Sequence, residues 1–171
     1  DLDDLPDLRR NLAAIMCSQE FVRAACIGPV ALKDLEPARE DIRRFRKALE
    51  AKGNGVRSFM NAASPGLVTA FQPNQHYPSH EAYVSAVADA MRPEYEAIAQ
   101  AGFDLQLDAP DLAMARPTGF QALSESEFLE RAEQNVEALN AATANIPAER
   151  MRMHICWGNY EGPHDHDIPL E

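Results

Sequence analysis

Short apolar runs alternate along the chain with longer segments in which apolar residues recur at every third or fourth position. Four of the runs have the length and the residue types of β-strands, and they span residues 21–27, 56–60, 103–107 and 151–156. Polar or turn-forming residues follow each run. The pattern therefore predicts four short strands separated by helices and loops.

The segments between the strands have the period of amphipathic helices. Helices are expected over residues 37–52, 80–100 and 125–145, and a serine in the N-cap position comes before the second and the third. Residues 8–17 are expected to be helical or irregular, and residues 61–79 to form a long polar loop rich in Pro, Asn and Ser.

Strands that alternate with long helices predict βαβ units and a parallel sheet, so the fold class expected is α/β. Four such units amount to half of a (βα)8 TIM barrel, and the 171 residues have the size of one domain. The chain starts without a methionine and ends in a loop after the fourth strand. We therefore expect residues 1–171 to be one partial (βα)8-barrel domain rather than a small open α/β domain.

Charge and composition narrow the classes of partner. The net charge of −11 argues against a nucleic-acid partner, which requires a basic face. The sequence has neither a basic amphipathic patch for a membrane surface nor the roughly 20 apolar residues of a membrane span. Its acidic first residues do not form a signal peptide, and its 3 cysteines lack C-x-x-C spacing. Reduced thiols and a cytoplasmic location are expected.

The last predicted strand carries a candidate metal site. His154 and Cys156 are two residues apart, so a strand would direct both side chains to one face. An imidazole and a thiolate suit zinc, which prefers nitrogen and sulfur ligands. A catalytic zinc needs three protein ligands, and only two are evident here. His164 and His166 lie in the next loop and could bind metal, or they could be part of a solvated loop with a His–carboxylate pair.

Asp108 directly follows the third predicted strand. In a parallel α/β fold the chemistry gathers at the carboxyl ends of the strands, where Asp108 could bind an amine or accept a proton. It could equally cap the turn that leads to Pro110. Spacing alone leaves both interpretations open.

Three segments together resemble one known family. FMNAASPG at 59–66, LQLDAPDLA at 105–113 and MHICWGNYEGPH at 153–164 resemble cobalamin-independent methionine synthase-like proteins, most closely the shorter relatives with a single barrel. CIGPV at 26–30 is similar to the Thr-Gly-Pro sequence at a strand end of that family. The resemblance extends from about Phe21 onward, and the order and spacing of the segments make it fairly specific.

The resemblance implies a (βα)8 barrel with a zinc ion that binds and activates a thiol substrate. By position, His154 and Cys156 would be zinc ligands, Asp108 would hold the amino group of homocysteine, and Ser64 would belong to the substrate pocket. Ala109 stands where the synthases have glutamate, which puts the substrate in doubt. The remaining zinc ligands of the family, a glutamate and a second cysteine, belong to later strands. The expected partner is therefore another copy of the chain or a missing half of the barrel.

The implied activity is zinc-dependent methyl transfer to a thiol such as homocysteine, as in methionine biosynthesis. The methyl donor would be 5-methyltetrahydrofolate or a similar compound. Two alternatives are kept. One is a zinc-dependent thiol transferase that acts on another electrophile, such as an epoxide. The other is a non-catalytic half-barrel that binds a metal or a partner.

Overall fold

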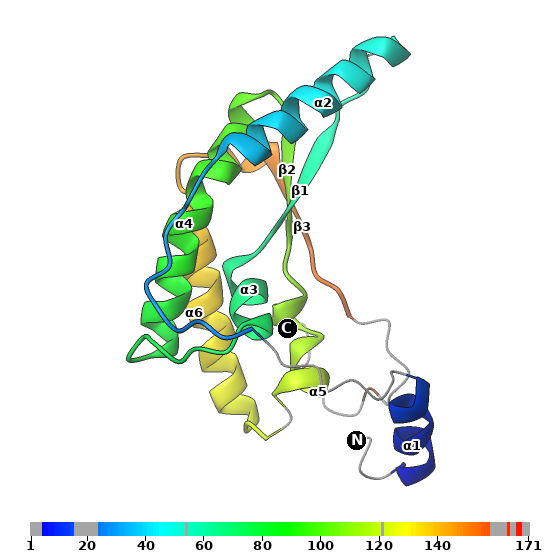
Figure 1. The fold of residues 1–171 in the computed structure, drawn as a ribbon, viewed down its shortest axis with the longest axis vertical. Helices are drawn as coiled ribbons and strands as arrows, with labels where there is room; N and C mark the ends of the chain where they lie inside the picture. Colours follow the sequence, from blue (N-terminus) through cyan, green and yellow to red (C-terminus); the bar gives the residue numbers. More distant parts are fainter. Residues whose placement is uncertain are drawn as a thin grey trace.

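The computed structural model describes residues 5–15, 24–53, 55–120, 122–157, 164 and 167–168. Helices and strands alternate through most of this part of the chain (Figure 1). In chain order the elements are α1 (Pro6–Ile15), α2 (Glu36–Lys52), β1 (Phe59–Ala63), α3 (Pro65–Phe71), α4 (His80–Gln100), β2 (Asp104–Asp108), η2 (Pro110–Leu112), α5 (Ala115–Gly119), α6 (Glu125–Thr143), η3 (Ala148–Arg150) and β3 (Met151–His154).

The strands form one parallel sheet in the order β1-β2-β3. Ala63 is the register partner of Asp108, which in turn is the register partner of His154. The α/β class and the parallel, sequential arrangement of the last three predicted strands are confirmed. The boundaries differ from those predicted, because β1 begins three residues later, at Phe59, and β3 ends at His154.

The first predicted strand, 21–27, is not a strand of this sheet over its described residues, 24–27. Cys26 instead forms an isolated parallel bridge with Asn74. Its N–H donates to the carbonyl of Pro73 (2.9 Å), and its carbonyl accepts from the N–H of Gln75 (2.9 Å). The backbone of this segment therefore pairs with the loop after α3 rather than with β1.

The expected loop at 61–79 contains the end of β1 and a helix, α3. Ser64 is the N-cap of α3, and its hydroxyl accepts the N–H of Leu67 at 3.0 Å. Pro65 occupies the first helical position, where a missing N–H costs nothing. Serine, proline and glycine in succession are also typical of turns, which is why the sequence pattern alone predicted a loop here.

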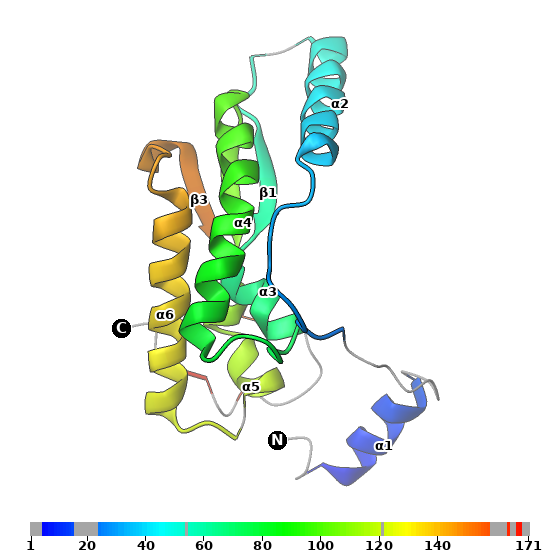
Figure 2. The ribbon, with the colours of Figure 1, turned by 60° about the vertical axis from the view of Figure 1, so that its left-hand side comes forward.

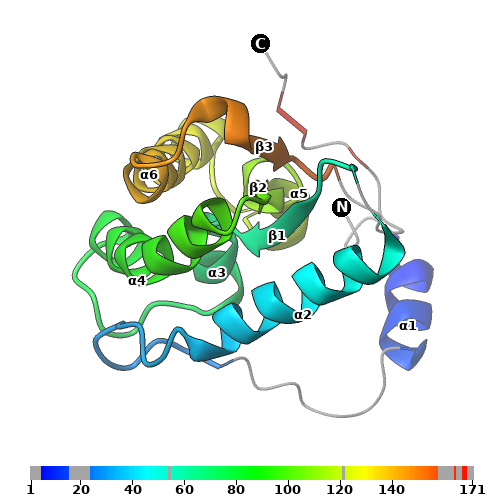
Figure 3. The ribbon, with the colours of Figure 1, turned by 90° about the horizontal axis from the view of Figure 1, so that it is seen from above.

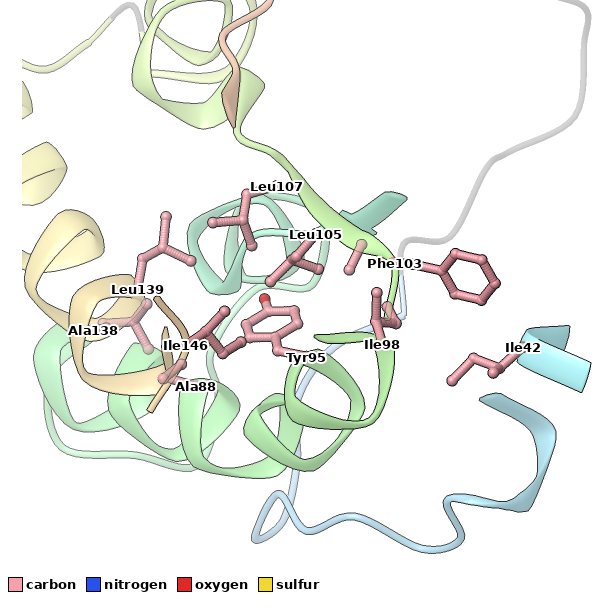
Figure 4. Packing of buried hydrophobic residues seen from close by; sticks show 13 residues of the cluster. Ile42, Ala88, Tyr95, Ile98, Phe103, Leu105, Leu107, Ala138, Leu139 and Ile146 are labelled. Atoms are coloured by element: carbon pink, nitrogen blue, oxygen red, sulfur yellow. The ribbon is translucent and has the colours of Figure 1, made fainter. Parts of the chain in front are cut away.

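Helices α4 and α6 lie side by side against one face of the sheet (Figures 2 and 3). Leu105 and Leu107 of β2 point into this layer and are buried. They meet Tyr95 and Ile98 of α4 and Leu139 of α6 (Figure 4). The Tyr95 hydroxyl donates to the carbonyl of Ala63 at 2.5 Å and so connects α4 to the end of β1.

The other face of the sheet carries mostly polar side chains. Arg152 of β3 donates to Gln106 of β2 (2.6 Å), and its guanidinium lies 3.5 Å from the ring centroid of Phe59 on β1. His154 and Asp108 belong to the same face. Across the described ranges, no helix combines the length and the apolar character that crossing a membrane would need.

Candidate functional site

Asp108 and His154 contact each other at the carboxyl ends of β2 and β3. Oδ1 of Asp108 lies 2.5 Å from Nδ1 of His154. When the carboxylate is ionised and the imidazole is neutral, this contact requires the hydrogen on Nδ1 and leaves the lone pair on Nε2. A carboxylate that accepts the Nδ1–H of a histidine is the usual outer partner of a metal-binding imidazole.

Oδ1 of Asp108 forms its hydrogen bond with His154 and not with a backbone N–H of the turn that follows. The backbone closes that turn, because the N–H of Leu112 donates to the carbonyl of Ala109 at 3.3 Å. The sequence left open whether Asp108 faces the site or caps the turn to Pro110. The hydrogen bond to His154 favours the first interpretation.

Cys156 follows β3 by two residues, and its free thiol is half-buried. The N–H of Ala109 donates to the carbonyl of His154 (2.9 Å), so the strands remain paired up to the last residue of β3. A nitrogen donor and a sulfur donor near the end of one strand fit a zinc ion in type. Two donors are too few for a zinc site, and the described part of the chain contains no group of three or more His, Cys, Asp or Glu side chains that could hold a metal.

His164, the other described histidine near the chain end, pairs with a carboxylate. Its Nδ1 lies 3.2 Å from Oδ2 of Asp167, and its ring stacks on Trp157 with centroids 4.4 Å apart. The Trp157 N–H also donates to Asp167. A His–carboxylate pair was one of the two interpretations of this segment, and metal binding by His164 stays untested. His166 lies outside the described residues.

Ser64, the expected substrate-pocket residue, is buried beside the site. Its N–H donates to the carbonyl of Asp108 (2.8 Å), while its hydroxyl donates to Oδ1 of Asp111 (2.6 Å). Only 2% of Ser64 is exposed, and the same hydroxyl caps α3. These contacts give Ser64 a structural role at the end of β1.

A buried polar network extends from Ser64 through three further residues. Asn135 of α6 donates from Nδ2 to Oδ2 of Asp111 (3.0 Å), and its Oδ1 lies 2.7 Å from Nε2 of His80 on α4. Burial raises the pKa of the Asp111 carboxyl, although the hydrogen bonds from Ser64 and Asn135 oppose this. Burial lowers the pKa of His80 and favours its neutral form.

Sequence reasoning missed this network as a unit. One signal was available in α6, where Asn135 falls on the same helical face as the apolar residues Phe128, Ala138, Leu139 and Ala142. A polar residue on an apolar face predicts a buried hydrogen bond. Nothing local identified Asp111 as its partner.

An apolar cavity of ≈ 210 Å³ lies beside Asp111, between α3 and α5. Leu67, Phe71, Met114 and Phe120 contribute to its wall, and Asp111 is the charged residue in its lining. The cavity belongs to the segments that follow β1 and β2. Metal-type donors, a buried carboxylate and an apolar cavity therefore all follow the carboxyl ends of the strands.

Comparison with known proteins assigns no family and no function to the chain. No protein-family model, no curated protein and no solved structure matches the chain significantly.

Proposed function

We propose that the chain contributes to a zinc-dependent methyl transfer to a thiol and that its sheet is part of a (βα)8 barrel of the methionine synthase-like type. The observation that carries the proposal is the hydrogen bond between Asp108 and His154, with Cys156 two residues further along the chain. Nitrogen and sulfur donors beside an orienting carboxylate are what such chemistry requires. The three segments that resemble the family include all three residues.

Each residue has a role that follows from its contacts. His154 would bind the metal through Nε2, because Nδ1 is used on Asp108, and Cys156 would bind it as a thiolate. Bound zinc would lower the pKa of a thiol substrate, so that the thiolate forms at neutral pH. Further ligands are required besides these two, and we propose that a second copy of the chain or a missing half of the barrel supplies them.

Asp108 has the capacity for a second role. A carboxylate has about four lone-pair positions, and the bond to His154 uses one of them. Its side chain is 39% exposed, so an ammonium group of the thiol substrate could reach it. In the transfer, the thiolate sulfur would form a bond to the methyl carbon while the bond between that carbon and the donor nitrogen breaks, and the nitrogen would keep the electron pair and take up a proton from water.

The exposed Phe59, on the face of the sheet opposite α4 and α6, supports the barrel part of the proposal. Both faces of parallel sheets are usually covered, yet Phe59 is 41% exposed on this face and Arg152 is exposed beside it. A second layer of strands or another copy of the chain would cover these residues. Sedimentation velocity tests this part, because a strictly monomeric chain over a wide concentration range would contradict self-association.

The test of function is a product assay on the zinc-supplied full chain. Homocysteine and 5-methyltetrahydrofolate are added, and methionine is measured by mass spectrometry. Methionine that disappears with His154→Ala supports the proposal. A thioether formed only when an epoxide replaces the folate supports the thiol transferase instead. Zinc binding without either product supports a non-catalytic fragment. The cytoplasmic location stays a proposal, supported by the free thiols of Cys26 and Cys156.

A further inference from the structure

Arg131 of α6 is a half-buried cation, and no carboxylate in the described part of the chain forms an ion pair with it. Its guanidinium lies 4.3 Å from the ring centroid of Phe120, and burial lowers its pKa. Among the described residues, none forms an ion pair or a hydrogen bond with its side chain. Other arginines, such as Arg43 and Arg92, pair with carboxylates on their own helices. A partly desolvated and unpaired guanidinium predicts that an anion binds there.

Among the described residues, the carboxylate whose charge acts on Arg131 does not form an ion pair with it. Asp111 acts on it at a distance and raises its pKa. Both oxygens of Asp111 already accept hydrogen bonds, one from Ser64 and one from Asn135. The charge of Arg131 is therefore available to a ligand.

Arg131 lines a pocket of ≈ 430 Å³ formed by α3, the loop after it, the end of α5, and the N-terminal parts of α4 and α6. In Figure 2, α3, α5 and the N-terminal ends of α4 and α6 lie close together. The other polar groups of the pocket are used within the chain. Thr69 donates to the carbonyl of Gly66, Tyr83 to that of Gln72, and Asn74 to that of Tyr77.

His80 also lines this pocket but adds no charge to it. Nδ2 of Asn135 donates to Asp111, so Oδ1 of Asn135 faces His80 and accepts from its Nε2–H. Burial lowers the pKa of the ring and so favours its neutral form. The pocket therefore offers one positive charge, from Arg131. Phe120, Pro73 and Ala70 provide apolar surface next to it.

We propose that this pocket binds a monocarboxylate with a flat apolar body, with the carboxylate on Arg131 and the body against Phe120. One guanidinium matches the charge and the planar shape of one carboxylate. The net charge of −11 acts against a more highly charged ligand such as a phosphate dianion. This site is separate from the Asp108–His154 pair and is proposed independently of methyl transfer.

The test uses benzoate as the probe, with benzamide as its neutral analogue and inorganic phosphate as a competitor. Binding is measured by NMR titration of the full chain, in which the signals of the pocket residues should shift with benzoate. A charged hydrogen bond is worth about 1.5–3 kcal/mol, so Arg131→Gln should weaken benzoate binding about tenfold or more. Arg44→Gln removes the same charge from an exposed position on α2 and should leave binding unchanged.

Three results would overturn the proposal. The first is that benzoate and benzamide bind equally well. The second is that Arg131→Gln and Arg44→Gln lose the same benzoate affinity. The third is that phosphate binds more tightly than benzoate. If Arg131→Gln does not fold, Arg131→Lys keeps the charge but loses the fork-shaped pair of donors. That variant should bind benzoate more weakly than the unmodified chain, and unchanged affinity would count against the assignment.

Discussion

Oδ1 of Asp108 lies 2.5 Å from Nδ1 of His154, and the two residues are register partners at the ends of neighbouring parallel strands. The strand pairing therefore sets the orientation of the imidazole before any ligand is present. If His154 binds a metal, Asp108 contributes to metal affinity by orienting the imidazole of His154. This relationship leads to the first prediction.

Asp108→Asn should weaken zinc binding about 10- to 100-fold, because a charged partner of the imidazole becomes a neutral one. Zinc affinity is measured by competition with a chromophoric chelator. Asp104→Asn is the matched control, because Asp104 is on the same strand and pairs with Arg57 and Arg150 at its other end. The control should leave zinc affinity unchanged. Unchanged zinc affinity in Asp108→Asn together with weaker homocysteine binding would assign Asp108 to the substrate alone.

Cys156→Ala should abolish the sulfur-to-metal charge-transfer band that Co²⁺ gives when a thiolate binds it. The fold should persist, because Cys156 is only half-buried and lies beyond the end of β3. The control is Cys26→Ala. Cys26 is buried, and its thiol donates to the carbonyl of Gly28 at 3.3 Å, so this change should lower stability and keep the band. A band that survives in Cys156→Ala but not in Cys26→Ala would contradict the assignment.

The elements that the sequence predicted best depend on local patterns. The helices expected at 37–52, 80–100 and 125–145 occur at Glu36–Lys52, His80–Gln100 and Glu125–Thr143. Apolar spacing indicates all three helices, and a serine N-cap marks the start of the second and the third. Ser124 and Glu127 form a reciprocal capping box at the start of the third.

The features that the sequence did not predict depend on distant partners. Helix α3 begins where Ser64 meets Asp111, 47 residues away, and Asn135 meets His80, 55 residues away. Cys26 pairs with the loop after α3, which no local pattern could identify. Asp108 was predicted to follow the third strand and His154 to lie within the fourth, because strands and their ends are visible in the sequence. Their direct hydrogen bond follows from register, which is set by the whole sheet.

Gly66→Ala should destabilise the chain by about 1–3 kcal/mol, the usual cost of overpacking a buried site. A Cβ at this position would come 2.0 Å from Oδ2 of Asp111 and 2.6 Å from Nδ2 of Asn135. The new methyl group must therefore displace the network that holds α3. Urea unfolding measures the loss.

Gly119→Ala is the matched control for the change at Gly66. Gly119 lies in α5, and a Cβ there meets nothing within 4 Å. Alanine is the better helix former, so stability should stay the same or rise by less than about 1 kcal/mol. Equal losses in the two variants would mean that the close approach to Asp111 does not explain the effect at Gly66.

The stability of the chain should depend on pH through Asp111. Burial raises the pKa of this carboxyl above its ordinary value of 3.8, so the folded state keeps a proton that the unfolded state has already lost. Between the ordinary and the raised pKa, the folded state binds more protons. The contribution of Asp111 to the free energy of unfolding is therefore present at low pH and decreases as pH rises through this window.

Asp111→Asn isolates this contribution, because asparagine does not titrate. His80 acts in the opposite sense. Burial lowers its pKa from 6.5, so its contribution to stability is lost as pH falls below that value. His80 is present in both proteins, and their difference in unfolding free energy reports mainly on Asp111. Both proteins are unfolded with urea at pH values from 4 to 7. As pH rises, the free energy of unfolding of the unmodified chain should fall relative to that of Asp111→Asn. A difference that is constant with pH would mean that Asp111 ionises in the folded protein as it does in the unfolded chain.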